Sequence, residues 1–218
     1  MRLFRYAGIH EAMTLTKGEA TRHRIVAAAA PIFNQRGFDG CSMQDLMEAT
    51  GLEKGGIYRH FANKQELAVE AFRFALAQNV KVRTDRLEDT PGTGKDAIAR
   101  LRNIIRIFVE TPSVVPGGCP LMNTAIDADD GNEVLRDLAR KGIQDWRARL
   151  SRTIEAGIAT GEIRKKTDPS RIANTIIATL EGALMISRIE DSKSALRDAQ
   201  VALDTVLDDI IPNRLKRP

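Results

Sequence analysis

Apolar residues recur along most of this chain at the three- and four-residue spacing of helices. In residues 95–111, for example, Ile98, Leu101, Ile105 and Phe108 fall on one helical face, with polar residues between them. Helices of this kind bury one side and leave the other in water. The pattern therefore predicts an all-α protein.

Glycine, proline and capping residues divide the pattern into helices. The expected helices cover residues 18–36, 42–50, 53–60, 64–89, 95–111, a stretch beginning at 118, 131–160, a stretch beginning at 169, and 193–210. Pro31 should disturb the first of them, because its ring removes one amide donor, and Gly37 should end it. Asp168 should cap the helix that starts at Pro169.

Residues 42–61 carry the signals of two short helices joined by a tight turn. Ser42 is a suitable N-cap, and Asp45 can bond back to its amide. Gly51 supplies the backbone freedom for the turn, and Leu52 can fill the space between the helices. The pattern predicts a helix-turn-helix.

The second short helix exposes groups suited to nucleic acids. Ile57 and Phe61 are spaced to pack inward, so the opposite face carries Lys54, two glycines, Tyr58, Arg59 and His60. Cationic side chains and hydroxyls bond phosphates or base edges, and glycine lets the backbone approach closely. Any helical bundle could bury Tyr58 and Phe61, but a bundle does not need this cluster of cations. DNA binding is therefore the favoured interpretation.

Residues 21–74 resemble the DNA-binding domain of the TetR family of bacterial transcriptional regulators. The resemblance rests on AAAAPIFNQRGF at 27–38, the Ser42 cap and KGGIYRHFANKQEL at 54–67. A weaker resemblance to one branch of the family's ligand domains covers the segment at 118–122.

The resemblance implies roles for individual residues. Lys54 and Gly55 would approach bases or backbone, and Tyr58, His60 and Lys64 would clamp phosphates. Met43 stands where the family often has a polar phosphate contact. The expected DNA-binding residues are Ser42, Lys54, Gly55, Tyr58, Arg59, His60 and Lys64.

The rest of the chain should form a helical ligand-binding and dimerisation domain. The expected division is an extension at 1–17, the DNA-binding domain at 18–64 and the second domain at 65–218. Phe108, Cys119, Met122 and Trp146 are the candidate ligand-binding residues, although such side chains more often pack in a core. The last two amphipathic helices would form a four-helix interface in a homodimer, or would instead face the monomer's own core.

Composition agrees with a DNA-binding protein of the cytoplasm. Hydrophobic residues make up 43% of the chain, and the net charge is +4. Residues 1–64 hold nine Lys or Arg and six Asp or Glu, so the positive charge is concentrated at the DNA-binding end. No long hydrophobic run suggests a signal peptide or membrane anchor, and two cysteines suit a reducing compartment.

Signals of catalysis are weak. His10, His23 and His60 do not have the spacing of a metal site, and Gly94-Lys95 fails the phosphate-loop pattern. We therefore expect no enzyme activity, no metal and no cofactor.

The sequence predicts a TetR-type regulator, a repressor that binds a palindromic DNA operator as a dimer and is released by an unknown small-molecule effector. One alternative is a repressor that senses thiol-reactive compounds through Cys119, since a helix start acidifies a thiol. Another is a helical carrier or enzyme without DNA binding. The effector, the operator and the regulated genes are left open.

Overall fold

The computed structural model describes residues 16–92, 94, 96–129 and 131–212, and every regular element in these residues is a helix. In chain order they are α1 (Lys17–Gly40), α2 (Met43–Thr50), α3 (Lys54–Tyr58), α4 (Lys64–Glu88), α5 (Ala97–Glu110), α6 (Pro120–Asp127), α7 (Glu133–Thr160), α8 (Pro169–Ile189) and α9 (Ser194–Ile210). The all-α prediction is confirmed. Most of the predicted extension, residues 1–15, lies outside the described residues.

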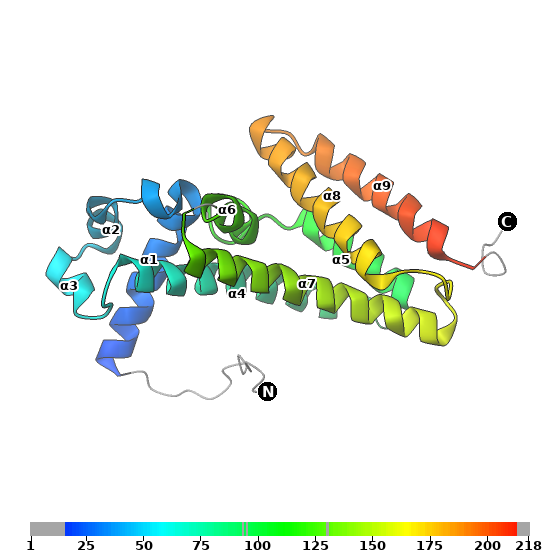
Figure 1. The fold of residues 1–218 in the computed structure, drawn as a ribbon, viewed down its shortest axis with the longest axis horizontal. Coiled ribbons are helices and arrows are strands. Elements are labelled where there is room, and N and C mark those ends of the chain that lie inside the picture. Colours follow the sequence, from blue (N-terminus) through cyan, green and yellow to red (C-terminus); the bar gives the residue numbers. More distant parts are fainter. Residues whose placement is uncertain (1–15, 93, 95, 130, 213–218) are drawn as a thin grey trace.

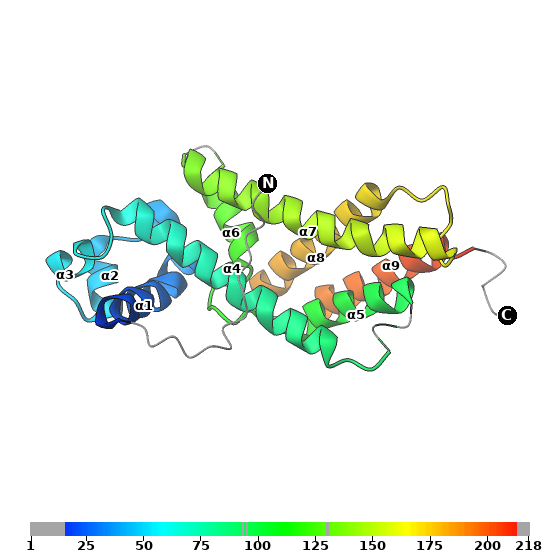
Figure 2. The same cartoon turned by 90° about the horizontal axis from the view of Figure 1, so that it is seen from below.

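The helices form an elongated molecule with α1, α2 and α3 at one end (Figure 1). α4 leads from this end toward the middle, and α7 extends from beside the first part of α4 to the opposite end of the molecule (Figure 2). α8 and α9 pack side by side against each other, far from α3 (Figure 1). The architecture therefore separates the helix-turn-helix from the last two helices.

Each end has its own apolar core. The core around α1, α2 and α3 consists of Ile25, Val26, Ala29, Cys41, Leu46, Ile57, Phe61 and Leu67. A larger core joins α5, α7, α8 and α9, and its fully buried members include Leu101, Ile105, Ile154, Ile176 and Leu180. Burial of these apolar stripes, rather than helix propensity, is the main source of helical stability in a protein of this kind.

Capping side chains fix several helix starts, as the sequence predicts. Ser42 Oγ accepts the amide of Asp45 at 3.1 Å, and the Asp45 carboxylate accepts the amide of Ser42 at 2.8 Å. Asp168 accepts the amides of Ser170 and Arg171 at 2.9 and 3.1 Å. These bonds satisfy amides that have no partner within the helix.

α1 departs from helical geometry at Gly37 rather than at Pro31. Gly37 has φ 73° and ψ 179°, whereas the helix continues through Pro31. Beside this break, Asp127 at the end of α6 accepts the amide of Phe38 at 2.7 Å. A Cβ atom at Gly37 would lie 2.1 Å from Asp127 Oδ1. The last turn of α1 is thus positioned by α6.

We expect Gly37→Ala to lower the free energy of unfolding by at least about 2 kcal/mol, because its φ and ψ are almost exclusive to glycine and the added methyl meets Asp127. Urea unfolding checks this result. The control is Gly55→Ala in α3, where an added Cβ meets no described atom within 4 Å. Equal stability of the two variants would contradict the expectation.

Candidate nucleic-acid interface and internal cavity

The turn between α2 and α3 fixes the direction in which α3 points. Gly51 adopts the left-handed conformation with φ 66°, and its amide donates to the carbonyl of Met47 at 2.9 Å. Leu52 packs against the small core, and Ile57 from α3 is 1% exposed. α3 therefore rests on α2 through its apolar side and presents its polar side outward.

Most of the predicted DNA-binding residues lie at this outer surface. Ser42, Lys54, Gly55 and Arg59 are exposed, and Tyr58, His60 and Lys64 are half-buried. The space around Gly55 is open, since an added Cβ meets no described atom within 4 Å. The backbone of α3 is accessible at this position.

Tyr58 links α3 to the start of α2. Its hydroxyl lies 3.3 Å from the Met43 sulfur, and Lys54 Nζ lies 5.9 Å from the Tyr58 ring centroid. A thioether is only a weak acceptor, so the hydroxyl loses little when it turns to a stronger one. The three side chains lie together beside the start of α2, with Lys54 at the start of α3 and Tyr58 at its end.

Lys64 and Ser42 have partners within the protein. The Lys64 ammonium donates to the carbonyl of Phe38 and lies 4.5 Å from the centroid of the Phe38 ring. The Ser42 hydroxyl donates to Asp45 Oδ2 at 2.7 Å while it accepts the Asp45 amide. In this structure both side chains contribute to the local fold.

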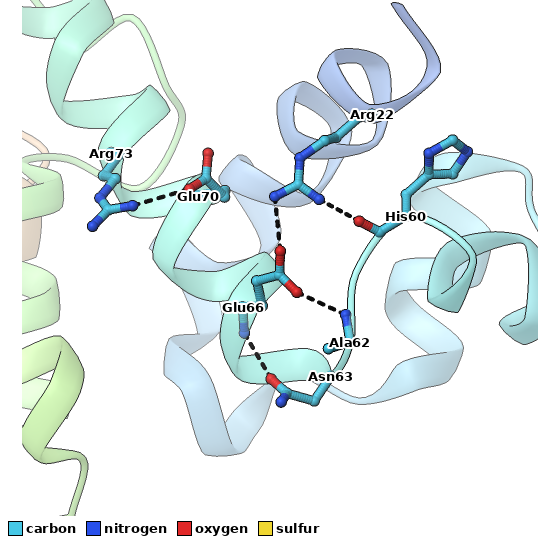
Figure 3. Close-up of polar contacts among 7 residues, drawn as sticks. All are labelled: Arg22, His60, Ala62, Asn63, Glu66, Glu70 and Arg73. Atoms are coloured by element: carbon cyan, nitrogen blue, oxygen red, sulfur yellow. Dashed lines mark hydrogen bonds and ion pairs between the residues drawn. The ribbon is translucent and has the colours of Figure 1, made fainter. Parts of the chain in front are cut away.

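A polar cluster holds the segment between α3 and α4 (Figure 3). Arg22 of α1 donates to the carbonyl of His60 and to Glu66 Oε1, the second bond at 2.9 Å. Glu66 Oε2 accepts the amide of Ala62 at 2.7 Å, and Asn63 caps α4 through the amide of Glu66 at 2.8 Å. The His60 ring points away from this cluster (Figure 3), so the cluster holds its backbone and leaves its side chain available.

The hydrogen bond from the Ala62 amide, followed by the one from Arg22, holds the pKa of Glu66 below its ordinary value. Glu66 therefore stays ionised at neutral pH and ties Arg22 of α1 to the Ala62 amide just before α4.

A cavity of about 770 Å³ lies between α4, α5, α7 and the start of α6. Three of the four candidate ligand-binding residues line it, namely Phe108, Cys119 and Trp146. The rings of Phe108 and Trp146 are stacked with their centroids 5.7 Å apart. Met122 packs instead in the adjoining apolar cluster with Cys119. Both the volume and the apolar walls are those of a small-molecule site.

The charged part of this cavity was not predicted from the sequence. The cavity is lined by four arginines, Arg83, Arg100, Arg149 and Arg152, and by three acidic residues, Asp96, Asp145 and Glu162. Arg83 follows Leu76 and Val80 on one helical face, and Arg149 follows Trp146 by three positions. An arginine at a position that continues an inward-facing apolar stripe is the sequence signal that could have identified these residues.

Cys119 does not have the environment of a reactive thiol. It is 5% exposed, and burial, with a smaller contribution from nearby Glu181, raises its pKa to about 12. The expectation that the start of α6 would acidify this thiol is wrong, because desolvation outweighs the helix dipole.

Polar contacts join the cavity wall to α1. Asn34 is 8% exposed, and its amide group donates to the carbonyl of Pro116 at 2.8 Å. Asn123 of α6 donates to the carbonyls of Asn34 and Gly117 at 2.9 and 2.8 Å. Cys119, which follows this loop, lines the cavity. One short segment thus touches both the cavity and α1.

Comparisons with known proteins cover both halves of the chain. A model of bacterial regulatory proteins of the tetR family matches residues 25–71, and a model of the tetracyclin repressor-like C-terminal domain matches residues 97–203. The crystal structure of a TetR transcriptional regulator from Chloroflexus aurantiacus is 40% identical, has a TM-score of 0.82, and covers 90% of this chain and 98% of its own. This chain belongs to the TetR family of transcriptional regulators, which are not enzymes.

Two further relatives have described activities. The transcriptional repressor DhaR of Mycobacterium sp. strain GP1 is 25% identical over 175 residues, which cover 80% of this chain and 86% of DhaR. The TetR family regulator CifR, as a cysteine mutant in complex with a 26-base-pair operator DNA, has a TM-score of 0.72 at 22% identity and covers 87% of this chain and 96% of its own. The second likeness shows the shared fold.

We expect Glu66→Gln to lower the free energy of unfolding by about 1 kcal/mol at pH 7, the usual worth of a charge-assisted bond that is partly exposed. The lowered pKa of Glu66 means that its stabilisation is present above the ordinary glutamate pKa and is lost as the pH falls through the folded-state pKa. The difference between variant and parent should therefore shrink below about pH 4. Urea unfolding across this pH range checks both points.

Glu70→Gln is the matched control, because Glu70 pairs only with Arg73 of the same helix among the described residues (Figure 3). A loss as large as that of Glu66→Gln would show that the junction has no special role.

Proposed function

We propose that this protein is a repressor that binds a roughly palindromic DNA operator as a homodimer and is released by a small molecule in the cavity. The observation that carries the proposal is the outer surface of α3, where Lys54, Gly55 and Arg59 are exposed beside Tyr58. The repression of genes by DhaR and the operator complex of CifR support the same function for this relative.

α3 would enter the major groove of DNA. Lys54 and Arg59 can reach phosphates or base edges, and the open backbone at Gly55 permits close approach. Tyr58 would exchange the Met43 sulfur for a phosphate oxygen, and Lys64 would exchange the Phe38 carbonyl. Ser42 would act mainly by fixing the start of α2. Residues 18–64 would serve as the DNA-binding domain and residues 65–218 as the ligand-binding and dimerisation domain.

α8 and α9 would form the dimer interface. They carry the exposed apolar side chains Met185, Ile186, Ile189 and Val201, of which Ile189 is 78% exposed. α8 is long and apolar enough to cross a membrane, but its inner side packs on α7 and α9 in the core. Contact with a second copy of the chain would bury the remaining apolar face of α8. A twofold dimer would also present two copies of α3 to the two half-sites of an operator.

A ligand in the cavity would act through α4 and through the segment before α6. α4 begins beside the α3 segment and lines the cavity farther along, and residues 116–118 hold Asn34 of α1. A ligand that favours the non-binding arrangement by about 2.8 kcal/mol shifts the equilibrium a hundredfold.

The two alternatives receive less support. Burial and the raised pKa of Cys119 oppose a sensor that depends on its thiolate. Membership of a regulator family opposes a carrier or an enzyme. DNA as the partner and two buried free cysteines suit a location in the cytoplasm.

The first test is selection of bound sequences from a random DNA pool by the purified protein. We expect enrichment of one palindrome, lost in the double variant Lys54→Ala and Tyr58→Ala because phosphate and base contacts disappear together. The affinity for that palindrome should fall steeply with salt, and the salt slope should decrease by about one per removed phosphate contact.

The matched control is Lys81→Ala, which removes an exposed lysine of α4 that pairs with Asp85 away from α3. No enrichment at low salt, or enrichment that survives the double variant, would overturn the proposed DNA surface.

The dimer is tested by Ile189→Glu, which places a carboxylate in the apolar face of α8. We expect a monomer in sedimentation experiments and at least a hundredfold weaker operator binding, because one helix-turn-helix binds weakly alone. Ile126→Glu in α6 is the control, since Ile126 is exposed to 68% and lies outside α8 and α9. A dimer that persists in the Ile189 variant would exclude this interface.

A further inference from the structure

We propose that the molecule held in the cavity is an organic acid, with an apolar or aromatic body and a carboxylate that pairs with Arg83 and Arg149. This inference rests on the proposed function only in taking the cavity as the effector site.

The cavity contains more available positive charge than negative charge. Four arginines come from three helices, Arg83 from α4, Arg100 from α5, and Arg149 and Arg152 from α7. Within the described part of the chain, none of the four guanidinium groups makes a hydrogen bond or an ion pair. Arg83 is half-buried, and the other three arginines are exposed. Guanidinium groups without a protein acceptor can form bidentate, charge-assisted hydrogen bonds with a ligand carboxylate.

The carboxylates of the cavity are mostly engaged elsewhere. Asp96 Oδ1 accepts the amide of Ala99 at 2.5 Å, and Glu162 Oε2 accepts the amide of Ala97 at 2.6 Å. Both therefore satisfy the first turn of α5, where the helix dipole also favours negative charge. Asp145 is left to attract Arg149 electrostatically. The balance of free groups remains cationic.

Arg83 is the best placed anchor for an acid. Its guanidinium carbon lies 4.2 Å from the centroid of the Phe108 ring, which fixes the group at the cavity wall. Burial lowers the pKa of Arg83, yet an arginine remains protonated at neutral pH.

Glu181 of α8 is the acidic group that acts electrostatically on Arg83. Both of its carboxylate oxygens are buried, and burial raises the pKa of Glu181, while smaller contributions from the Cys119 thiol and from Arg83 lower it. Glu181 does not line the cavity and makes no ion pair with Arg83 among the described residues, so the Arg83 donors are open to a ligand carboxylate.

The apolar walls define the rest of the ligand. Phe108 and Trp146 are stacked, and Leu76, Val80 and Ile104 line the same space. The volume of about 770 Å³ falls in the range that holds a drug-sized molecule. A neutral apolar molecule would form no ion pair with the guanidinium groups, and a cation would be repelled by them. An acid with an apolar body satisfies both parts of the cavity.

Isothermal titration of the full-length protein tests the assignment. The probes are octanoate, 4-phenylbutyrate and 2-naphthoate, each compared with its own primary amide, which has nearly the same shape but no charge. We expect at least one acid to bind at least tenfold more tightly than its amide. Arg83→Met and Arg149→Met should each weaken that acid at least tenfold and leave amide binding unchanged, because methionine preserves apolar bulk.

Arg140→Met is the matched control, since Arg140 is an exposed arginine of α7 that pairs with Asp137 and does not line the cavity. Thermal unfolding and operator binding of each variant verify that it is folded. Equal binding of acids and amides, no binding by any acid, or an equal loss in Arg140→Met would overturn the proposal.

The design separates this proposal from the proposed function. If the selected palindrome binds but every acid fails, the ligand class is wrong and the DNA-binding function stands. If an acid binds through Arg83 and Arg149 but does not release the palindrome, the binding site stands and the cavity is not the effector site.

Discussion

A helix of five residues cannot hold its own shape in water, and α3 is such a helix. Its position depends on groups outside it. Ile57 and Phe61 anchor it in the small core, and Arg22 holds the carbonyl of His60 directly after it. The same arginine holds Glu66 in the first turn of α4. The proposed DNA-binding surface is therefore as rigid as the contacts of α1 with α3 and α4.

Local chemistry made much of this architecture predictable. Capping and turn residues interact with groups only a few positions away, so the sequence spacing predicts their roles. This holds for the Ser42–Asp45 pair, for Gly51 and for Asp168. Membership of the small core followed equally from the helical positions of Ile57 and Phe61. By contrast, Gly37 proved more disruptive than Pro31, and the contact with Asp127 lies 89 residues farther along the chain from Phe38.

The lining of the cavity was only partly predictable from the sequence. Phe108 and Trp146 were identifiable as large apolar residues on inward faces, but Met122 has the same character and packs outside the lining. Arg83 resembles a solvent-exposed arginine until three helices are assembled around the cavity, and Arg149 lines the cavity although it remains exposed. Cys119 illustrates the same limit, since the helix start is visible in the sequence and the burial that outweighs it is not. Side-chain roles that depend on several helices require the tertiary structure.

The cavity lining and the outer surface of α3 have no residue in common. They meet only through shared supports, α4 and the short loop whose carbonyls bind Asn34. A Cβ atom at Gly117 would lie 2.8 Å from Asn34 Nδ2, so that loop tolerates little change. The walls on α5 and α7 carry no such restriction from α1. Under the proposed function, engineering could thus replace the effector bound in the cavity without altering the DNA bound by α3, provided that the glycine loop is left intact.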